Sequence, residues 1–598
     1  MVSRAFKLRV RRRFRMRKRQ VEAFGSQAEE NLERNLFRRF ERLRSVRRFV
    51  LGWLLLVVLL IGCMVVQIRA LGGYYQTLQP VAGGRISEGI VGSFTNANPV
   101  YATSSVDLAV SRLLFSGLYT YDNKNQLVGD LAAGPVEVNS NGTVYTVHLK
   151  PDLKWQDGKP LTSDDVAFTY QVIQNPDAKS PLNGSWQGIK IATPDARTVT
   201  FTLPTPLAAF QYSLTNGIIP KHVLSNVPMN AFRTASFNTS NPIGSGPFQW
   251  QAIEVTGGSP QDRRERIALQ RSDSYHDGPP KLANFVVHTF RTQSDMINSF
   301  KAKEINAMAG LSEVPASLKN DESVRSYGLP LTAAVMTFFK TSEGILSDVK
   351  VRQALVQAVN TNAIIEKLGY ATKPVVEPLL QGQLGYDPAL AQSGYNLDAA
   401  KALLDSQGWT MNEDGYRYKD RQPLTFTLSA ENTAEYSKVA KELKNYWKAI
   451  GVKVEVQLKD SSDFQSTLAF HSYDALLYGI SIGTDPDVYA YWDSTQANML
   501  SNNRLNFSEY QSSAADSALA AGRTRIEPAL RAIKYRPFLQ SWKDDAPALG
   551  LYQPRFLYVT RGQLFNLKEH YINTPADRYN NVNEWMIRQA AVSQAEVE

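Results

Sequence analysis

An uncharged apolar stretch near the amino terminus divides this chain into two unequal parts. It runs from Phe49 to Ile68 and reads FVLGWLLLVVLLIGCMVVQI. A helix needs about 20 residues to cross the hydrocarbon core of a bilayer, and this stretch has that length. The sequence after it contains no second apolar run as long. We therefore expect a single transmembrane helix at residues 49–68, with most of the chain on one side of the membrane.

The positive charge of the chain is concentrated before this helix. Residues 1–48 carry 17 Lys and Arg against 5 acidic residues, whereas the whole chain of 598 residues has a net charge of +10. Basic residues favour the cytoplasmic side of a span, so residues 1–48 are expected in the cytoplasm and the larger part outside. The cluster RRRFRMRKR at residues 11–19 suits the anionic lipids of the inner leaflet. Nucleic-acid binding is disfavoured, because a basic cluster beside a span more often sets topology.

The one cysteine, Cys63, leaves a second kind of membrane attachment open. The sequence LIGC at residues 60–63 resembles the lipobox of bacterial lipoproteins, in which the chain is cleaved before the cysteine and held by lipid. The uncleaved helix is favoured because the apolar run continues past Cys63 and the preceding leader is long for a signal peptide. With no cysteine after the span, the outer part forms no disulfides. Residues 69–83 are interpreted as a stalk.

The stretch KWQDGKPLTSDDVAFTY at residues 154–170 predicts a structural corner. The residues before it alternate between apolar and polar, as in a half-buried strand, and Asp-Gly and Pro at residues 157–160 indicate a turn. Thr162 is then placed as a helix N-cap with Asp165 in the capping-box position. The two adjacent carboxylates therefore have structural roles, and we do not interpret them as a general acid and base.

Later segments consist of a helix followed by a strand, which indicates an α/β fold. The clearest unit has apolar residues at helical spacing from Tyr436 to Ile450, a stop at Gly451, and strand-like alternation from Val452 to Leu458. The chain has no Gly-x-Ser-x-Gly, phosphate-loop, His-Glu-x-x-His or Cys-x-x-Cys motif, and its six histidines lack ligand-like spacing. We predict that it is not an enzyme and that it needs no cofactor or metal.

Five segments in order point to one family. The stretch at residues 154–170 follows the pattern Trp or Phe, x, Asp-Gly, x, Pro-Leu-Thr, x, x-Asp-Val, x-Phe-Thr. The other four are LLFSGLYTYD at 113–122, PIGSGPF at 242–248, VKVRQALVQAVN at 349–360 and GTDPD at 483–487. On these segments the chain from about Gly84 to Ile587 resembles the extracytoplasmic solute-binding proteins of peptide-type ABC importers, known as family 5.

The resemblance implies an α/β fold of two lobes, of the type II periplasmic-binding-protein kind, behind the transmembrane helix. By family analogy lobe 1 covers residues 84–332, lobe 2 covers residues 333–548, and residues 549–598 return to lobe 1. The chain is expected to cross between the lobes near Thr337–Phe339 and again near Leu551. Two crossings make a hinge, and a ligand that contacts both lobes stabilises the closed state.

The resemblance also implies that the protein captures oligopeptides or similar solutes for an ABC permease and its ATPase subunits. In well-known members an aspartate three residues before the Asp-Pro element receives the ammonium group of the ligand, but this chain has Ile482 there. A buried ammonium without a carboxylate partner is costly. Either Asp485 or Asp487 therefore takes over this role, or the ligand has no free amino end.

The candidate ligand-binding residues come from segments equivalent to the family's contact regions. Each candidate has an alternative interpretation as a core aromatic or a turn residue, and Asn close before Pro is a common turn signal. The candidates are Phe94, Asn96 and Asn98 in the loop SFTNANP, Phe338 on the expected crossing, and Tyr478, Ser481, Ile482 and Asp485 around the Asp-Pro element.

A second hypothesis keeps the fold but not transport. A simple lipoprotein receptor has no use for a cytoplasmic leader of the length of residues 1–48. The alternative function is therefore a surface sensor or interaction protein that signals or scaffolds through this basic segment. Genes for permease and ATPase subunits beside this one would favour the importer.

Overall fold

The computed structural model describes residues 46–259, 263–498, 501 and 504–593, so the basic cluster at residues 11–19 lies outside the described residues. Helix α3 (Arg47–Tyr75) contains a 20-residue segment with a mean hydropathy of 3.0, long and apolar enough to cross a membrane. The segment expected to form a stalk consists of the end of α3 and strand β1 (Gln76–Val81). Strand β1 pairs with the last strand, β23 (Arg588–Ser593).

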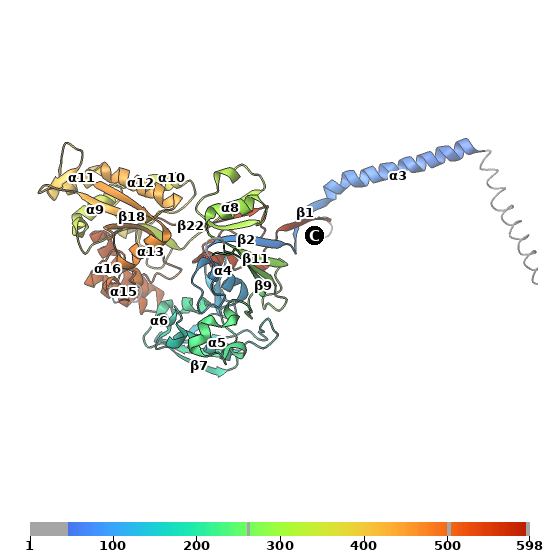
Figure 1. Cartoon of the computed structure of the whole chain (residues 1–598), viewed down its shortest axis with the longest axis horizontal. Coiled ribbons are helices and arrows are strands. Elements are labelled where there is room, and N and C mark those ends of the chain that lie inside the picture. The colour runs from blue at the N-terminus through green and yellow to red at the C-terminus, as the bar shows by residue number, and fades with distance from the viewer. Residues whose placement is uncertain (1–45, 260–262, 499–500, 502–503, 594–598) are drawn as a thin grey trace, which may run out of the picture. The chain divides into compact units, whose positions relative to one another are not determined.

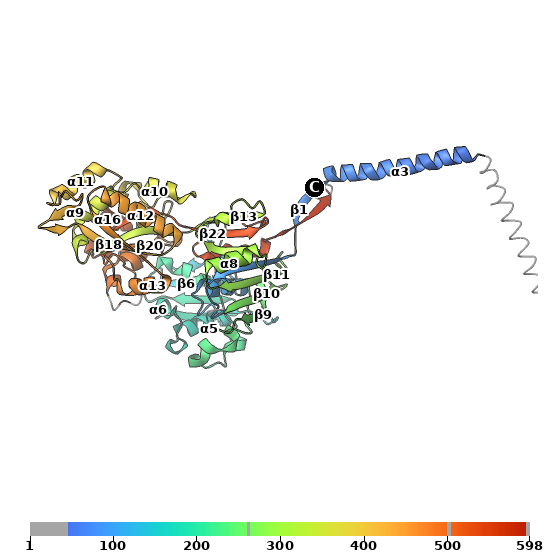
Figure 2. The same cartoon turned by 45° about the horizontal axis from the view of Figure 1, so that its top comes forward.

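Lobe 1 is built on a sheet of seven strands with β2 at its centre. In spatial order the strands are β13 (Val324–Pro330), β22 (Arg555–Arg561), β12 (Ala307–Leu311), β2 (Arg85–Val91), β11 (Asn284–Phe290), β10 (Arg264–Arg271) and β9 (Phe248–Thr256). Strand β2 is parallel to β11 and β12, and both faces of β11 are largely buried, as in the middle of a covered sheet. Strand β22 comes from the C-terminal part of the chain and lies antiparallel between β12 and β13 (Figure 2).

A smaller sheet of four strands extends lobe 1. Its order is β5 (Glu137–Val138), β6 (Val144–His148), β8 (Thr198–Thr202) and β7 (Lys190–Asp195). The predicted corner is confirmed, because β6 and a turn lead into α5 (Ser163–Gln174), whose capping box joins Thr162 and Asp165. The Thr162 N–H donates to Oδ2 of Asp165 at 2.9 Å, and Asp164 pairs with Lys221 at the surface. Both carboxylates therefore serve the structure.

Lobe 2 is a five-stranded sheet covered by helices on both faces. The strand order is β19 (Lys453–Lys459), β18 (Thr425–Glu431), β20 (Ala475–Ser481), β14 (Ala333–Phe339) and β21 (Ala548–Tyr552). One face packs on α9 (Val349–Gln357), α11 (Leu397–Ser406) and α12 (Ala434–Lys448), and the other on α13 (Ser461–Phe470), α15 (Ser513–Arg523) and α16 (Pro528–Asp545) (Figure 1). The predicted helix and strand at residues 436–458 correspond to α12 and β19.

The chain passes between the two large sheets twice, at neighbouring places. Strand β13 of lobe 1 ends at Pro330 and β14 of lobe 2 begins at Ala333, and the return lies between Tyr552 and Arg555. The two connections are joined where the Leu331 N–H donates to the Pro554 carbonyl at 2.9 Å. The first crossing thus lies earlier in the chain than Thr337–Phe339, which belong to the middle of the lobe 2 sheet.

Candidate functional site

A cavity of about 410 Å³ lies in the wall of lobe 1. This volume falls within the range of about 300–1,000 Å³ that is common for small-molecule sites. The wall is built from α4 (Ser105–Leu114), from the segment around residues 212–217, and from the tail at residues 573–577. The side chains used below are Arg112, Tyr121, Trp186, Tyr212, Asn573, Thr574 and Asp577. The cavity therefore joins residues that are almost 500 positions apart in the sequence.

Lobe 2 meets this wall beside the hinge. The Thr484 hydroxyl donates to Oδ1 of Asn573 at 3.1 Å and accepts from Nδ2 of Asn125 at 3.1 Å. Thr332, on the first crossing, donates to the same oxygen of Asn573 at 2.5 Å. A movement of one lobe against the other must change this network, which ties the cavity wall to the hinge.

The lobes also touch at a second place, which we call the lip contact and define by Ile526 and Gly142. Ile526 precedes α16 in lobe 2, and Gly142 lies in the hairpin between β5 and β6 of lobe 1. A Cβ atom at Gly142 would lie 2.5 Å from Cγ1 of Ile526, so a side chain at this position would collide with it. Gly142 also has a φ of +68°, which favours glycine. The lip contact brings the two lobes together away from the hinge.

A buried ion pair in lobe 2 lies close to the cavity wall of lobe 1. Asp485 accepts two hydrogen bonds from Arg531 of α16, at 2.8 Å and 2.7 Å. Both side chains are almost fully buried, and together they act electrostatically on Tyr212 of the cavity wall. The interaction with Asp485 raises the pKa of Arg531 although burial opposes it, so the guanidinium stays charged. The pair presents little net charge to a ligand.

The neighbouring acid, Asp487, is also engaged. It accepts from Nε and Nη2 of Arg523 at 3.2 Å and 3.1 Å. Burial raises the pKa of Asp487, and the charge of Arg523 opposes this shift. Both carboxylates of the Asp-Pro element are therefore already paired with an arginine.

The other candidates around this element lie along β20. Tyr478 is half-buried and packs edge-on against Phe507, with ring centroids 5.3 Å apart. The exposed Ser481 accepts at its carbonyl oxygen from the Tyr491 hydroxyl at 2.8 Å. Ile482 is buried, and its N–H donates to the Thr332 carbonyl at 3.0 Å. This segment is held close to the hinge, but its side chains do not line the 410 Å³ cavity.

The side chains of the loop SFTNANP make mainly structural contacts. Phe94 is buried against Trp250, and Asn96 and Asn98 are buried in hydrogen bonds within the loop and to its neighbours. Oδ1 of Asn98 accepts from the Val100 N–H at 3.0 Å, as in an Asx turn. The structure thus favours the turn interpretation for both asparagines. The same turn places Pro99 against the cavity.

The assignment of Phe338 to the cleft is corrected by the structure. Its ring is fully buried in lobe 2, with centroids 5.7 Å from that of Trp492 and 5.6 Å from that of Phe507. All residues of β14 are buried because helices cover both faces of the sheet, so the continuous apolar run gave no sign of which side chain faces outward. Phe338 is a core residue.

The sequence interpretation missed the wall residues Tyr121, Tyr212, Asn573 and Asp577. Tyr121 lies in the family-like segment LLFSGLYTYD, which did not mark it as a wall residue, and Tyr212 carried no local motif. The sequence Thr574-Pro575-Ala576-Asp577 is a recognisable start of a helical turn, and the structure has a capping box there. Its position in the cavity wall depends on the return of the tail to lobe 1, which no local pattern reveals.

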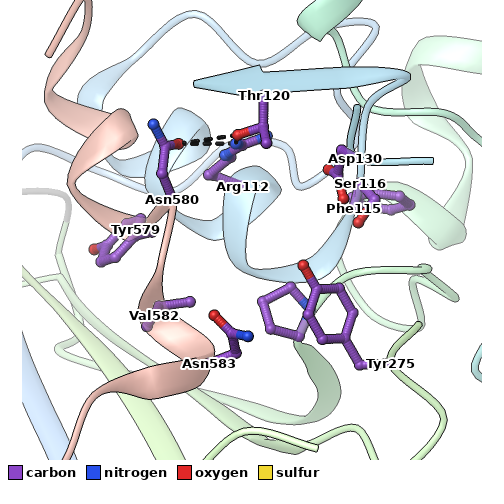
Figure 3. A pocket seen from close by; sticks show the side chains of 11 residues that line it. Arg112, Phe115, Ser116, Thr120, Asp130, Tyr275, Tyr579, Asn580, Val582 and Asn583 are labelled. Carbon is purple, nitrogen blue, oxygen red and sulfur yellow. Dashed lines mark hydrogen bonds between the residues drawn. The ribbon is translucent and has the colours of Figure 1, made fainter. Parts of the chain in front are cut away.

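A second, much smaller cavity of about 20 Å³ lies behind Arg112 (Figure 3). Arg112 donates from Nη2 to Oδ1 of Asn580 at 2.8 Å and also to the Thr120 hydroxyl. Asp130 in the same wall pairs with His276 at 2.9 Å, and although burial raises the pKa of Asp130, the hydrogen bond and charge of His276 lower it overall. The space suits about one water molecule. Within the described residues, no three His, Cys, Asp or Glu side chains gather as metal ligands.

A cavity on one lobe that the second lobe faces, with two chain crossings behind it, defines a two-lobed ligand-binding protein. The chain belongs to the family of bacterial extracellular solute-binding proteins, family 5, whose sequence model, described as its Middle region, matches residues 126–501. This match confirms the family resemblance of the sequence motifs and the two-lobed fold class. The family consists of binding proteins, so the chain is not an enzyme.

Known relatives cover most of the chain. The oligopeptide-binding protein AppA of Bacillus subtilis (strain 168) is 26% identical over 523 residues, which are 85% of this chain and 92% of the relative. The crystal structure of AppA with a nonapeptide covers 85% of this chain and 100% of its own, with 25% identity and a TM-score of 0.68. NikZ from Campylobacter jejuni, solved with Ni(L-His), covers 84% and 99%, with 26% identity and a TM-score of 0.72. Members with these folds thus hold ligands as different as a peptide and a metal complex.

Proposed function

We propose that this protein is a membrane-tethered extracytoplasmic receptor that captures peptides or similar solutes between its lobes and delivers them to an ABC permease with its ATPase subunits. The observation that carries the proposal is the cavity of about 410 Å³ in lobe 1, whose wall residue Asn573 is bonded to Thr484 of lobe 2 beside the hinge. The names of relatives such as the oligopeptide-binding AppA and the dipeptide-binding protein of Escherichia coli (strain K12) support peptides as the solute class.

The proposed arrangement in the membrane follows from the charge and length of the first 83 residues. Residues 1–48 lie in the cytoplasm, residues 49–68 span the membrane, and residues 69–83 lead to the outer domain. The apolar segment of α3 and the preceding excess of basic residues support this arrangement. In the outer domain we assign residues 84–332 to lobe 1, 333–548 to lobe 2, and 549–598 to the return and the tail.

The proposed ligand contacts on lobe 2 belong to the segment from Tyr478 to Asp485. Thr484 of this segment meets Asn125 and Asn573 of lobe 1, which supports its place at the mouth of the site. Tyr478 and Ser481 are the candidates with side chains that are not fully buried. Backbone groups at such an edge can pair with an extended peptide without reading its side chains.

The first test measures thermal unfolding of the full-length protein in detergent against pooled tripeptides. A ligand that binds the folded state stabilises it by mass action, by about 2.7 kcal/mol at a hundredfold excess over Kd. We expect some pools to raise the unfolding temperature by several degrees and a pool of sugars to leave it unchanged. If no peptide pool changed the unfolding temperature from that of the protein alone, peptide binding would be contradicted.

The second test decides how the protein is attached. The intact mass of protein extracted from the membranes of the producing bacterium should correspond to the full chain, including residues 1–48. A mass that begins at Cys63 and carries added lipid would instead establish the lipoprotein form. Co-purification of permease and ATPase subunits with the cross-linked protein tests delivery, and recovery of the receptor without either subunit would count against it.

A further inference from the structure

Asp577 occupies an unusual position in the cavity wall. Among the described residues that line the cavity, Asp577 is the one acid and Arg112 is the one base. The charge of Arg112 opposes the rise in the pKa of Asp577, but Arg112 forms no ion pair with it, and its Nη2 is directed to Asn580 and Thr120 on the side of the smaller cavity (Figure 3). No Lys, Arg or His forms an ion pair with Asp577 in the part of the chain that the structure describes. Asp577 lines the larger cavity.

Two backbone hydrogen bonds of Asp577 meet one oxygen of its carboxylate. Oδ2 accepts from the Thr574 N–H at 2.8 Å and from the Asn573 N–H at 3.2 Å, so both backbone donors meet the same oxygen. Burial raises the pKa of this carboxyl, against the opposing charge of Arg112 and the hydrogen bonds of Thr574. A cation at the other oxygen, Oδ1, would offset the cost of burying the charge.

The carboxylates across the cleft are already neutralised. Asp485 is held by Arg531 through two hydrogen bonds, and Asp487 is held by Arg523. A ligand ammonium could displace these arginines only by leaving a guanidinium buried without its partner, which is strongly unfavourable. The position three residues before the Asp-Pro element is the apolar Ile482. Lobe 2 therefore offers no carboxylate for an amino group at this place.

We propose that Asp577 receives the ammonium group of the ligand, so that recognition of a free amino end lies on lobe 1 and comes from the C-terminal tail. This inference rests on the proposed function and names the residue that fixes the orientation of the solute in the cavity. A ligand with a free amino group would then bind lobe 1 first, and lobe 2 would close over it at the lip contact.

The test compares free and blocked amino ends on the full-length protein in detergent. The probes are a library of tripeptides and the same library acetylated at the amino end, with retained peptides counted by mass spectrometry after gel filtration. We expect the wild-type protein to retain free tripeptides at least about tenfold better than acetylated ones, since a hydrogen bond to a charged group is lost on acetylation. Asp577→Asn should remove this preference while its amide oxygen still accepts from the Thr574 N–H.

Two control variants separate the charge from the structural role. Asp165→Asn makes the same change in the capping box of α5, which does not line the cavity, so it should keep the preference. Asp485→Asn tests lobe 2 as the alternative source of the amino-end preference. Loss of the preference in Asp485→Asn with no change in Asp577→Asn would overturn the inference, as would equal retention of both libraries by the wild-type protein. Retention of neither library would instead overturn peptide binding itself, and the inference with it.

Discussion

Buried carboxylates in this protein differ in what compensates their charge. Glu88 in lobe 1 accepts from Arg578 at 2.5 Å and from Tyr558 at 2.7 Å, and Asp485 in lobe 2 has its two bonds from Arg531. Glu377 is equally buried but accepts only the Asp387 N–H, at 3.3 Å, and its Oε2 has no partner among the described groups. A buried charge is tolerated only when it is paired, so these residues should respond differently to substitution and to pH.

Removing the partner of Asp485 should be costly. Arg531→Leu leaves the carboxylate buried without its two hydrogen bonds, and we expect the free energy of unfolding to fall by about 3–5 kcal/mol. Urea denaturation followed by tryptophan fluorescence measures this loss. The double variant Arg531→Leu/Asp485→Leu removes both charges and should recover much of it. An Arg531→Leu variant as stable as the wild-type protein would show that the ion pair contributes little to the stability of lobe 2.

Glu377 should make stability depend on pH. Burial raises the pKa of Glu377 to about 8 from its ordinary value of 4.5. Between these two values the folded state holds a proton that the unfolded state has lost, so stability falls as the pH rises from about 4.5 to 8, by about 1.4 kcal/mol for each pKa unit.

The variant Glu377→Gln cannot ionise, and its amide oxygen can still accept from the Asp387 N–H. Its unfolding temperature should match that of the wild-type protein near pH 4.5 and exceed it at pH 8. Unfolding temperatures measured across this range provide the check. Parallel curves for the two proteins at all pH values would contradict the raised pKa.

Among the elements, the loop before α16 carries the lobe 2 side of the lip contact. The lip contact is made in a state in which both lobes meet, and Ile526 is still 36% exposed there. Its apolar contact is lost when the lobes separate. The contact therefore adds to the stability of the closed state and not to that of either lobe.

Shortening this side chain should speed the release of ligand. Ile526→Ala removes part of a half-buried apolar contact, worth about 1 kcal/mol for the closed state, which corresponds to an approximately fivefold faster dissociation. Stopped-flow fluorescence can follow release of a retained tripeptide, because Trp186 lines the cavity. Ile533→Ala is a matched control on α16, since Ile533 is 64% exposed. Equal release rates for both variants and the wild-type protein would show that the lip contact does not hold the cleft closed.

The elements that the sequence predicted well are those with local signals. The corner at residues 154–170 has a turn and a capping box, and α12 with β19 shows a change of period from helical to alternating. The crossing near Phe338 was misplaced because β14 is buried on both faces and shows no alternation. Asp577 was missed because its place in the cavity depends on the fold of the whole chain. The motifs of the family fixed the fold class, while the cavity wall required long-range packing.

At the scale of the molecule, lobe 1 is complete only when the end of the chain has returned to it. Strand β22 joins β12 to β13, and Arg578 and Tyr579 bind Glu88, almost 500 residues earlier. The core of lobe 1 likewise includes Trp585 of the tail. The core of lobe 2, by contrast, is formed entirely by residues 334–552. The two lobes should therefore differ in their need for the tail.

Truncation tests this difference directly. A chain ending at Gln553 lacks β22 and leaves Glu88 buried without its cation, so we expect amide hydrogens of β2, β11 and β12 to exchange rapidly while those of β14 and β18 stay protected. Hydrogen exchange with mass spectrometry measures both sets in one experiment. A chain ending at Ile587 loses only β23 and should keep the protection of lobe 1. If the chain ending at Gln553 also kept this protection, lobe 1 would fold without its tail. The tail that carries Asp577 would then pack onto a lobe that is already formed.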